Sequence, residues 1–293
     1  MTNNIIEIKN LTKYYGKTKG VEDLNMEIRQ GEIFGFLGPN GAGKTTTIRC
    51  LMDFIKADKG SIKIMGKDAY KDSVILKKDI GYLSDEVYLY DNWNGKKHIN
   101  FISKLNGKHN IADKLVKRLD MDLNKKSKNL STGNRQKLGV ILAFLFEPKL
   151  LILDEPTKGL DPLLQNTLYE LIDEAVAKGS TVFMSSHNLS EVDRVCDRVG
   201  IIKDGKMIAT EDITELKSKR IYSVRIYFVD SFKKEDFIGD DVKVEKELRN
   251  GLLLKVKGDI NKVIDLLSQH KLKDIDISPA SLEDIFLEFY KKN

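Results

Sequence analysis

The sequence predicts an α/β fold built around a phosphate-binding loop that joins a buried strand to a helix. The segment Gly38–Thr46, GPNGAGKTT, fits the pattern G-x-x-x-x-G-K-[ST]. The apolar run Ile33–Leu37 before it predicts a buried strand, and Thr46–Met52 after it predicts a helix. A second buried strand at Leu150–Leu153 ends in two acidic residues, and strand–helix alternation continues beyond residue 150.

The loop has the chemistry of a phosphate site. Its glycines let successive backbone N–H groups point at an anion, and the following helix adds the positive end of its dipole. Lys44 supplies a charge for the β- and γ-phosphates, and the Thr45 hydroxyl is suited to ligate Mg²⁺. We expect nucleotide contacts from the whole loop: Gly38, Pro39, Asn40, Gly41, Ala42, Gly43, Lys44, Thr45 and Thr46.

The two acids at the end of the second strand divide into two roles. Asp154 is placed to hold Mg²⁺ through water, and Glu155 is placed to polarise a water for attack on the γ-phosphate. Acids at strand ends are common in α/β proteins, so the pair gains its meaning from the phosphate loop. Together they predict a nucleotide triphosphatase.

Further motifs surround this strand in a fixed order. LSTGN, at Leu130–Asn134, lies upstream; GLDP, at Gly159–Pro162, and then Ser185-Ser186-His187 lie downstream. With the phosphate loop and the acid pair, this order resembles the nucleotide-binding domain of ATP-binding cassette (ABC) transporters over residues 4–220. The resemblance implies a P-loop NTPase core with an antiparallel β-subdomain and a helical insertion.

The resemblance also implies residue roles. Tyr15 matches the aromatic residue that stacks on adenine, with Tyr14 as a competing candidate, and His187 matches the residue that reaches the γ-phosphate. Ser131 and Gly133 match the residues that cover an ATP held by the opposite subunit. ATP and Mg²⁺ are the expected cofactors. The expected catalytic residues are Lys44, Glu155 and His187, and the expected metal ligands are Thr45, Asp85 and Asp154.

The chain departs from the family pattern at three places. LSTGN places Thr132 and Asn134 where the family usually has glycine and glutamine. Asp85 takes the place of the Q-loop glutamine, and a carboxylate there is still able to ligate Mg²⁺. Lys158 precedes GLDP where a small polar residue is usual, which makes the contact of Asp161 across a dimer interface uncertain.

The order of patterns along the chain predicts two domains. Residues 1–220 form the nucleotide-binding domain, with a helical subdomain at about 87–147, and residues 221–293 form a small α+β domain. The ending Ser278–Phe286 resembles the closing segment of ATPases of the ABC-2 export class, and Leu282, Ile285, Phe286 and Phe289 follow helix spacing. Tyr88, Tyr90 and Trp93 form an aromatic group that serves either a partner interface or the core.

We therefore expect the ATPase subunit of an ABC transporter, most simply an ABC-2 type exporter. It would work with separate transmembrane permease subunits and a second ATPase copy, at the cytoplasmic face of the cell membrane. No apolar stretch is long enough for a span, and the start Met1–Asn10 resembles neither a signal peptide nor a lipidation motif. The net charge of +5 is too small to indicate nucleic-acid binding.

Two rival functions follow from the same motifs. A soluble ABC ATPase could act on ribosomes or DNA, but such proteins usually fuse two cassettes or carry long coiled-coil insertions, and this sequence has neither pattern. A GTPase switch would need an Asn-Lys-x-Asp motif, which the sequence lacks.

Overall fold

The computed structural model describes residues 3–107, 110–218, 221–239, 241–258 and 260–279. The chain divides into two compact units, Met1–Thr210 and Glu211–Asn293. The sequence placed the boundary ten residues later, at 220, where the pattern of apolar residues changes. Each unit has its own sheet and core, so we describe them separately.

The larger unit is built on a six-stranded sheet with the strand order β10-β9-β3-β8-β7-β6. Pairs β3–β8, β3–β9, β6–β7 and β7–β8 are all parallel. Parallel pairing brings the carboxyl ends of these strands to one edge of the sheet. The strands are β3 (Ile33–Leu37), β6 (Ile80–Leu83), β7 (Leu150–Asp154), β8 (Thr181–Ser186), β9 (Arg198–Lys203) and β10 (Lys206–Asp212).

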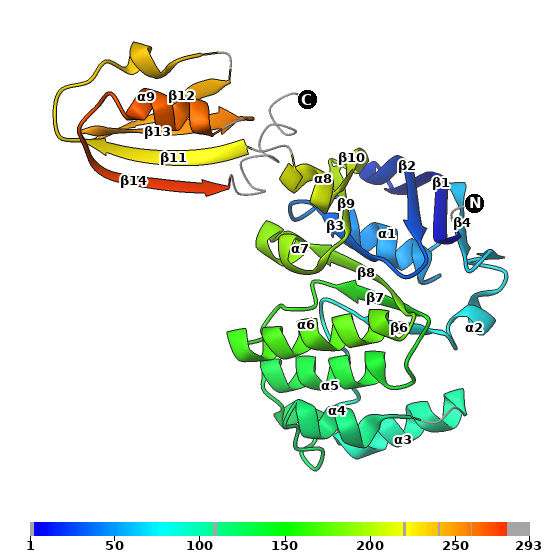
Figure 1. The fold of residues 1–293 in the computed structure, drawn as a ribbon. Helices are drawn as coiled ribbons and strands as arrows, with labels where there is room; N and C mark the ends of the chain where they lie inside the picture. Colours follow the sequence, from blue (N-terminus) through cyan, green and yellow to red (C-terminus); the bar gives the residue numbers. More distant parts are fainter. Residues whose placement is uncertain (1–2, 108–109, 219–220, 240, 259, 280–293) are drawn as a thin grey trace. The chain divides into compact units, whose positions relative to one another are not determined.

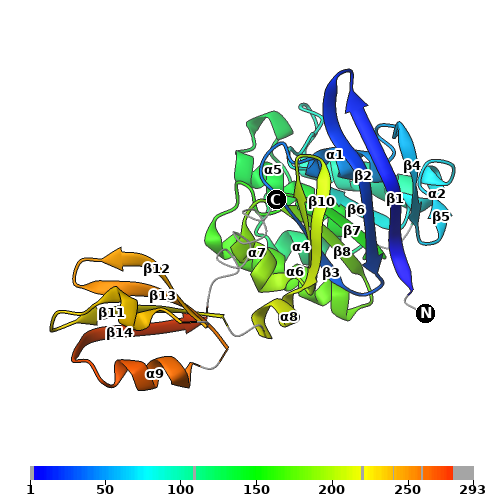
Figure 2. The same cartoon turned by 90° about the horizontal axis from the view of Figure 1, so that it is seen from above.

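A second, antiparallel sheet in the same unit has the order β2-β1-β4-β5. Its strands are β1 (Asn4–Tyr15), β2 (Thr18–Arg29), β4 (Lys59–Ile64) and β5 (Lys67–Asp68). Figure 2 shows β1 and β2 as a long hairpin. Ile6, Ile8 and Leu24 of this sheet share one buried cluster with Phe34 and Phe36 of β3, so the two sheets enclose a common core.

Helices complete this unit in two groups. The helical insertion holds α3 (Gly95–Asn106) and α4 (Ala112–Arg118); both contact α5 (Thr132–Phe144), which in turn contacts β6. Figure 1 shows α5 between the sheet and the α3–α4 pair. The other helices are α1 (Lys44–Leu51), α2 (Ser73–Leu76), the 3-10 turn η1 (Ser127–Asn129), α6 (Pro162–Ala177) and α7 (Leu189–Val195).

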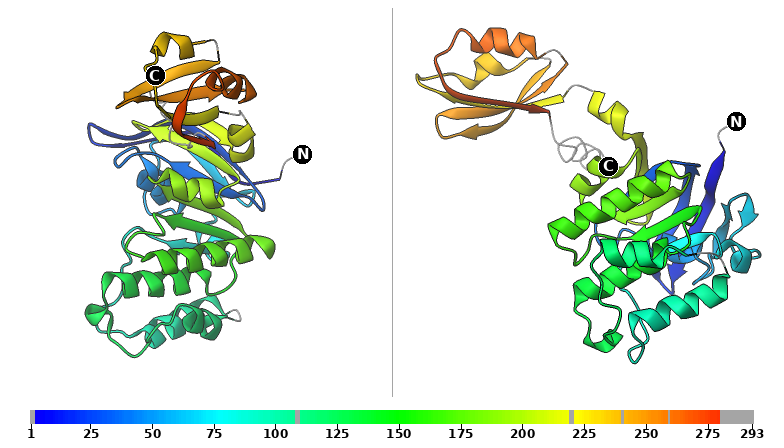
Figure 3. Two further views of the ribbon diagram at one scale, coloured as in Figure 1. Left: turned by 60° about the vertical axis from the view of Figure 1, so that its left-hand side comes forward. Right: turned by 60° about the horizontal axis from the view of Figure 1, so that its bottom comes forward.

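The smaller unit holds a four-stranded sheet with the order β12-β13-β11-β14, and its strand pairs are antiparallel. Figures 2 and 3 show α9 on one face of this sheet. Val224, Ile226, Leu252 and Leu254 are buried on that face because they alternate along β11 and β13. The elements are α8 (Ile213–Ser218), β11 (Ile221–Phe228), η2 (Lys234–Phe237), β12 (Val242–Leu248), β13 (Gly251–Lys257), α9 (Asn261–Leu267) and β14 (Leu272–Pro279).

The α/β class predicted from the sequence is confirmed. The structure starts the loop helix at Lys44, two residues before the prediction, because the phosphate loop leads directly into its first turn. It adds strand β14, which the sequence analysis did not predict. Leu282, Ile285, Phe286 and Phe289 lie outside the described residues. Within the part of the chain that is described, no helix has the length and apolar character needed to span a membrane.

The close approach of β6 to α5 gives a test of the fold. A Cβ atom added at Gly81 would lie 2.1 Å from the Ala143 carbonyl oxygen, so Gly81→Ala must push α5 away from the sheet. We expect it to lower the free energy of unfolding by about 1–3 kcal/mol in urea denaturation. Gly133→Ala in the same helix is the control. Its Cβ would meet only Gly159 O, at 3.4 Å, and unchanged or higher stability is expected. Equal stability of the two variants would contradict a fixed distance between β6 and α5.

Candidate active site

The phosphate loop connects β3 to α1 and depends on two of its glycines. A Cβ atom at Gly38 would lie 2.5 Å from the Ile202 carbonyl oxygen. Gly43 has a φ of 110°, and a Cβ atom there would lie 2.6 Å from the Gly20 carbonyl oxygen. Any other residue at either position would therefore displace the loop from the neighbouring strands.

Lys44 is buried at the first position of α1. Its Nζ donates to the carbonyl oxygens of Gly38 at 2.6 Å and Pro39 at 3.3 Å, and lies 3.2 Å from Glu155 Oε1. The side chain is only 6% exposed. A buried ammonium group needs such partners to offset its lost hydration. The structure thus brings Lys44 together with Glu155, the expected acid that follows β7.

Asp154 ends β7 and is almost completely buried. The Ser185 hydroxyl of β8 donates to its Oδ1 at 2.5 Å, and the Thr45 side chain also hydrogen-bonds to the carboxylate. Burial raises the pKa of Asp154, and these two hydrogen bonds oppose that rise. The oxygen atoms of Thr45 and Asp154 form the hard donor set that suits Mg²⁺.

Glu155 occupies a strained position at the start of the following turn. Its φ of 49° lies in the left-handed region, which costs a non-glycine residue energy. Its backbone N–H is held by Ser185 through the carbonyl oxygen at 3.2 Å and the hydroxyl at 3.1 Å. This conformation directs the carboxylate toward Lys44 and His187.

The two oxygen atoms of the Glu155 carboxylate differ in their hydrogen bonding. Oε2 lies 2.8 Å from His187 Nδ1. Oε1 is within ion-pair distance of Lys44 Nζ but not in hydrogen-bond geometry, and it is buried with no hydrogen-bond partner among the residues that the structure describes. A buried carboxylate oxygen without a donor is costly, and it is the group that a reacting water would satisfy.

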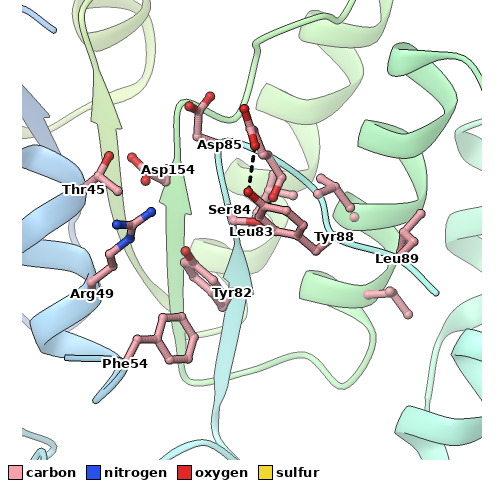
Figure 4. A pocket seen from close by; sticks show the side chains of 14 residues that line it. Thr45, Arg49, Phe54, Tyr82, Leu83, Ser84, Asp85, Tyr88, Leu89 and Asp154 are labelled. Carbon is pink, nitrogen blue, oxygen red and sulfur yellow. Dashed lines mark hydrogen bonds between the residues drawn. The ribbon is translucent and has the colours of Figure 1, made fainter. Parts of the chain in front are cut away.

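Asp85 lines a cleft of about 580 Å³ together with Thr45 and Asp154. Figure 4 shows Asp154 between Thr45 and Asp85, with Arg49 below Thr45 and Asp154 and with Tyr88 on the Asp85 side. Asp85 Oδ1 accepts a hydrogen bond from Lys158 Nζ at 2.6 Å. The expected metal ligand thus borders the site, and its carboxylate is paired with a lysine.

Ser131 and Gly133 stand at the start of α5. The Ser131 hydroxyl caps the helix by accepting from Asn134 N at 3.3 Å. Among the described residues, no hydrogen bond joins either of them to the phosphate loop of the same chain. They lie beside Gly159, whose φ is 75°. A Cβ atom added at Gly159 would lie 3.2 Å from the Thr132 methyl group.

Tyr15 lies beside the phosphate loop. A Cβ atom at Gly20 would lie 3.1 Å from the Tyr15 ring and 2.9 Å from the Thr46 methyl group. The side chains of Tyr15 and Thr46 therefore both lie next to the backbone of Gly20. The Tyr15 ring is partly exposed. Tyr14 instead donates its hydroxyl to Glu22 at 2.8 Å. The contacts therefore favour Tyr15 over Tyr14 as the residue that meets a base.

Ser185 has no role predicted from the sequence, although its hydroxyl donates to the Asp154 carboxylate and accepts from the Glu155 N–H. The available signal was its place directly before Ser186 and His187. Ser185→Ala removes a hydrogen bond to a buried carboxylate, and we expect a loss of about 1.5–3 kcal/mol in the free energy of unfolding at neutral pH. Urea denaturation measures this, with Ser190→Ala, an exposed serine of α7, as the control. A Ser185→Ala protein as stable as the control would contradict the proposed support of Asp154.

Comparisons with known proteins agree with this geometry. A family model described as "ABC transporter" matches residues 21–158. The bacitracin transport ATP-binding protein BcrA of Bacillus licheniformis is 36% identical over 97% of this chain and 96% of its own length. The linearmycin resistance ATP-binding protein LnrL of Bacillus subtilis is 34% identical over 73% of this chain and 71% of its own.

Solved structures show the same fold. The ATP-binding subunit of an ABC transporter superimposes with a TM-score of 0.68 at 28% identity, over 73% of this chain and 92% of that one. A bacterial ABC transporter cassette solved as a dimer has a TM-score of 0.65 at 22% identity, over 71% and 98%, and supports the fold alone. The chain belongs to the ATP-binding proteins of ABC transporters, and it is the ATP-hydrolysing subunit of such a transporter.

Proposed function

We propose that this chain hydrolyses ATP at the carboxyl edge of its parallel sheet to drive export. The observation that carries the proposal is the Glu155 carboxylate, which lies between Lys44 and His187 and whose Oε1 accepts no hydrogen bond from the described residues. Phosphoryl transfer needs little covalent help from the protein and depends on positioned charges and a positioned water. This site supplies the charges, and Glu155 supplies an acceptor for the water.

Each residue acts on a different part of the reaction. Lys44 places its charge at the β- and γ-phosphates, where it balances charge in the transition state. Glu155 Oε1 accepts a hydrogen bond from the attacking water and polarises it. His187, hydrogen-bonded to Oε2, orients the carboxylate and faces the γ-phosphate from the other side. The phosphate loop from Gly38 to Thr46 holds the remaining phosphate oxygens through its N–H groups.

Thr45 and Asp154 are the residues that would hold Mg²⁺. Both present oxygen atoms to the cleft, and the Asp85 carboxylate lines the same cleft. The metal, when bound, neutralises phosphate charge. The part of this chain is to fix its position: Ser185 orients Asp154, and Asp154 and Thr45 are held together by their hydrogen bond.

A second copy completes the site. Ser131 and Gly133 are surface residues at a helix N-terminus, and their contacts run to Gly159 rather than to their own phosphate loop. We infer that they cover the γ-phosphate of ATP bound by another cassette, in a homodimer. The helix N-terminus at Ser131 favours an anion at that position.

The membrane partner would dock at the cleft beside Asp85. Tyr88 and Phe54 line this cleft, and Tyr88 is 84% exposed. Tyr90 does not line the cleft; it is 61% exposed and packs on Trp93, which also contacts His98 and Phe101. Exposed aromatic side chains around a cleft favour an interface. We therefore place the chain at the cytoplasmic face of the membrane, bound to separate permease subunits.

Export is favoured over import and over soluble roles by the relatives. BcrA is described as a bacitracin transport protein and LnrL as a linearmycin resistance protein, and both resemblances cover most of the chain. None of the relatives compared is described as acting on ribosomes or DNA. We assign residues 1–220 to the cassette and residues 221–293 to a small accessory domain.

The proposal predicts a trapped dimer. Glu155→Gln keeps the size of the side chain and removes its basicity, so ATP hydrolysis should slow by about 10² or more while ATP binding persists. The bound ATP should join two chains, and the apparent mass in gel filtration should double with ATP and Mg²⁺. Ser131→Arg added to this variant should abolish the doubling, since it places a bulky side chain at the facing phosphate.

Two controls separate the parts of this prediction. Lys44→Ala in the same background should neither retain ATP nor dimerise, because the loop loses its phosphate charge. Glu215→Gln, a change of the same kind in α8, should hydrolyse ATP at the unaltered rate. Wild-type hydrolysis by Glu155→Gln would refute the role of the carboxylate. Tight ATP binding by a persistent monomer would refute the homodimer and leave the residue roles standing.

A further inference from the structure

Lys158 and Asp85 are joined by an ion pair at the rim of the cleft. Lys158 lies in the turn after β7, where its N–H donates to the Glu155 carbonyl oxygen at 3.1 Å, and Asp85 lies in the segment after β6. Their side chains meet at 2.6 Å although they are 73 residues apart in sequence. The pair therefore ties the turn that carries the catalytic acid to the wall of the cleft that faces Thr45 and Asp154.

Stability does not account for this ion pair. The two side chains are 55% and 34% exposed, and exposed pairs of this kind contribute little to the free energy of unfolding. The surrounding charges are more informative. The carboxylates of Asp85, Glu86 and Glu155 all lie close enough to raise the pKa of Lys158. The hydrogen bond to Asp85 is the largest of the effects that raise the pKa of Lys158. Lys158 is thus a fixed positive charge at neutral pH.

The same carboxylate also acts on the metal side of the cleft. The negative charge of Asp85 contributes to the raised pKa of Asp154, so the two carboxylates influence each other across the cleft. Asp85 lines the cleft with Thr45 and Asp154. A cation placed between these oxygen atoms would attract the Asp85 carboxylate, but Lys158 already holds it. Asp85 therefore has two competing cationic partners.

We propose that Lys158 is a positioning residue that holds the Asp85 carboxylate at the rim of the cleft, so that Mg²⁺ must compete with Lys158 for it when ATP binds. The inference rests on the proposed function, in which Mg²⁺ and ATP bind beside Thr45 and Asp154. The Mg²⁺ concentration that ATP binding requires is then set by this competition. The exchange also removes the side-chain contact between the cleft and the turn from Glu155 to Gly159, which borders Thr132 at the start of α5.

The test measures ATP binding rather than turnover. In the Glu155→Gln background, a fluorescent ATP analogue is bound while Mg²⁺ is titrated, and the midpoint is recorded. Lys158→Gln should lower the midpoint by about two- to fivefold, because it removes the competitor. Asp85→Asn should raise it, because it removes a ligand. Lys158→Arg keeps the charge and should restore the midpoint of the background protein.

A double variant shows whether Lys158 acts through Asp85. In the Asp85→Asn background, Lys158→Gln should retain less than half of its effect on the midpoint, because its partner is already gone. Lys149→Gln is the matched control. Lys149 pairs with Asp79 at 3.1 Å and joins the opposite ends of the same two strands, so its loss should leave the midpoint unchanged.

The outcomes separate this inference from the function on which it rests. Mg²⁺-dependent binding with an unchanged or raised midpoint in Lys158→Gln overturns the competition and leaves the ATP site standing. A full effect of Lys158→Gln in the absence of Asp85 also overturns it, since Lys158 would then act directly on the nucleotide. A background protein that binds no ATP at any Mg²⁺ concentration overturns the proposed function and this inference together.

Discussion

The candidate site depends on the register of three parallel strands. Leu37 pairs with Ser186, and Ser185 pairs with Asp154, so β3, β8 and β7 end at the same level. The phosphate loop, the buried acid and its serine partner leave the sheet side by side for this reason. A shift of one residue along β8 would turn Ser185 to the other face of the sheet and remove the hydrogen bond that supports Asp154.

The site holds three charged groups away from water, where the charged form of a side chain is disfavoured. Lys44 and Asp154 are buried, and Glu155 is mostly so, and burial of a charge costs free energy unless hydrogen bonds or a partner offset it. The backbone of Glu155 adds strain through its positive φ. These features do not make the fold more stable. They hold the groups at distances that suit phosphate chemistry, and the buried core beneath them supplies the stability.

Local signals explain what could be predicted from the sequence. The phosphate loop and the strand before Asp154 each carry their own pattern within a few residues, and the structure has them where expected. The Ser185 hydrogen bond was not predictable in this way, because it depends on pairing between strands 31 residues apart. Strand β14 was missed because a proline ends it and only Leu272, Ile275 and Ile277 mark its apolar face.

The three departures from the family pattern prove to be neighbours. Lys158 holds Asp85, and the next residue, Gly159, lies against the Thr132 methyl group. No sequence pattern links these positions, since they come from three separate segments. The turn contacts both the cleft and α5. An exposed ion pair holds it on the side of the cleft, and Gln136 of α5 donates to the Pro156 carbonyl oxygen at 3.1 Å on the other side. In the proposed dimer this turn leads to Asp161 and α6. A charge change where Mg²⁺ binds therefore has a short physical route to the residues that would face the second copy.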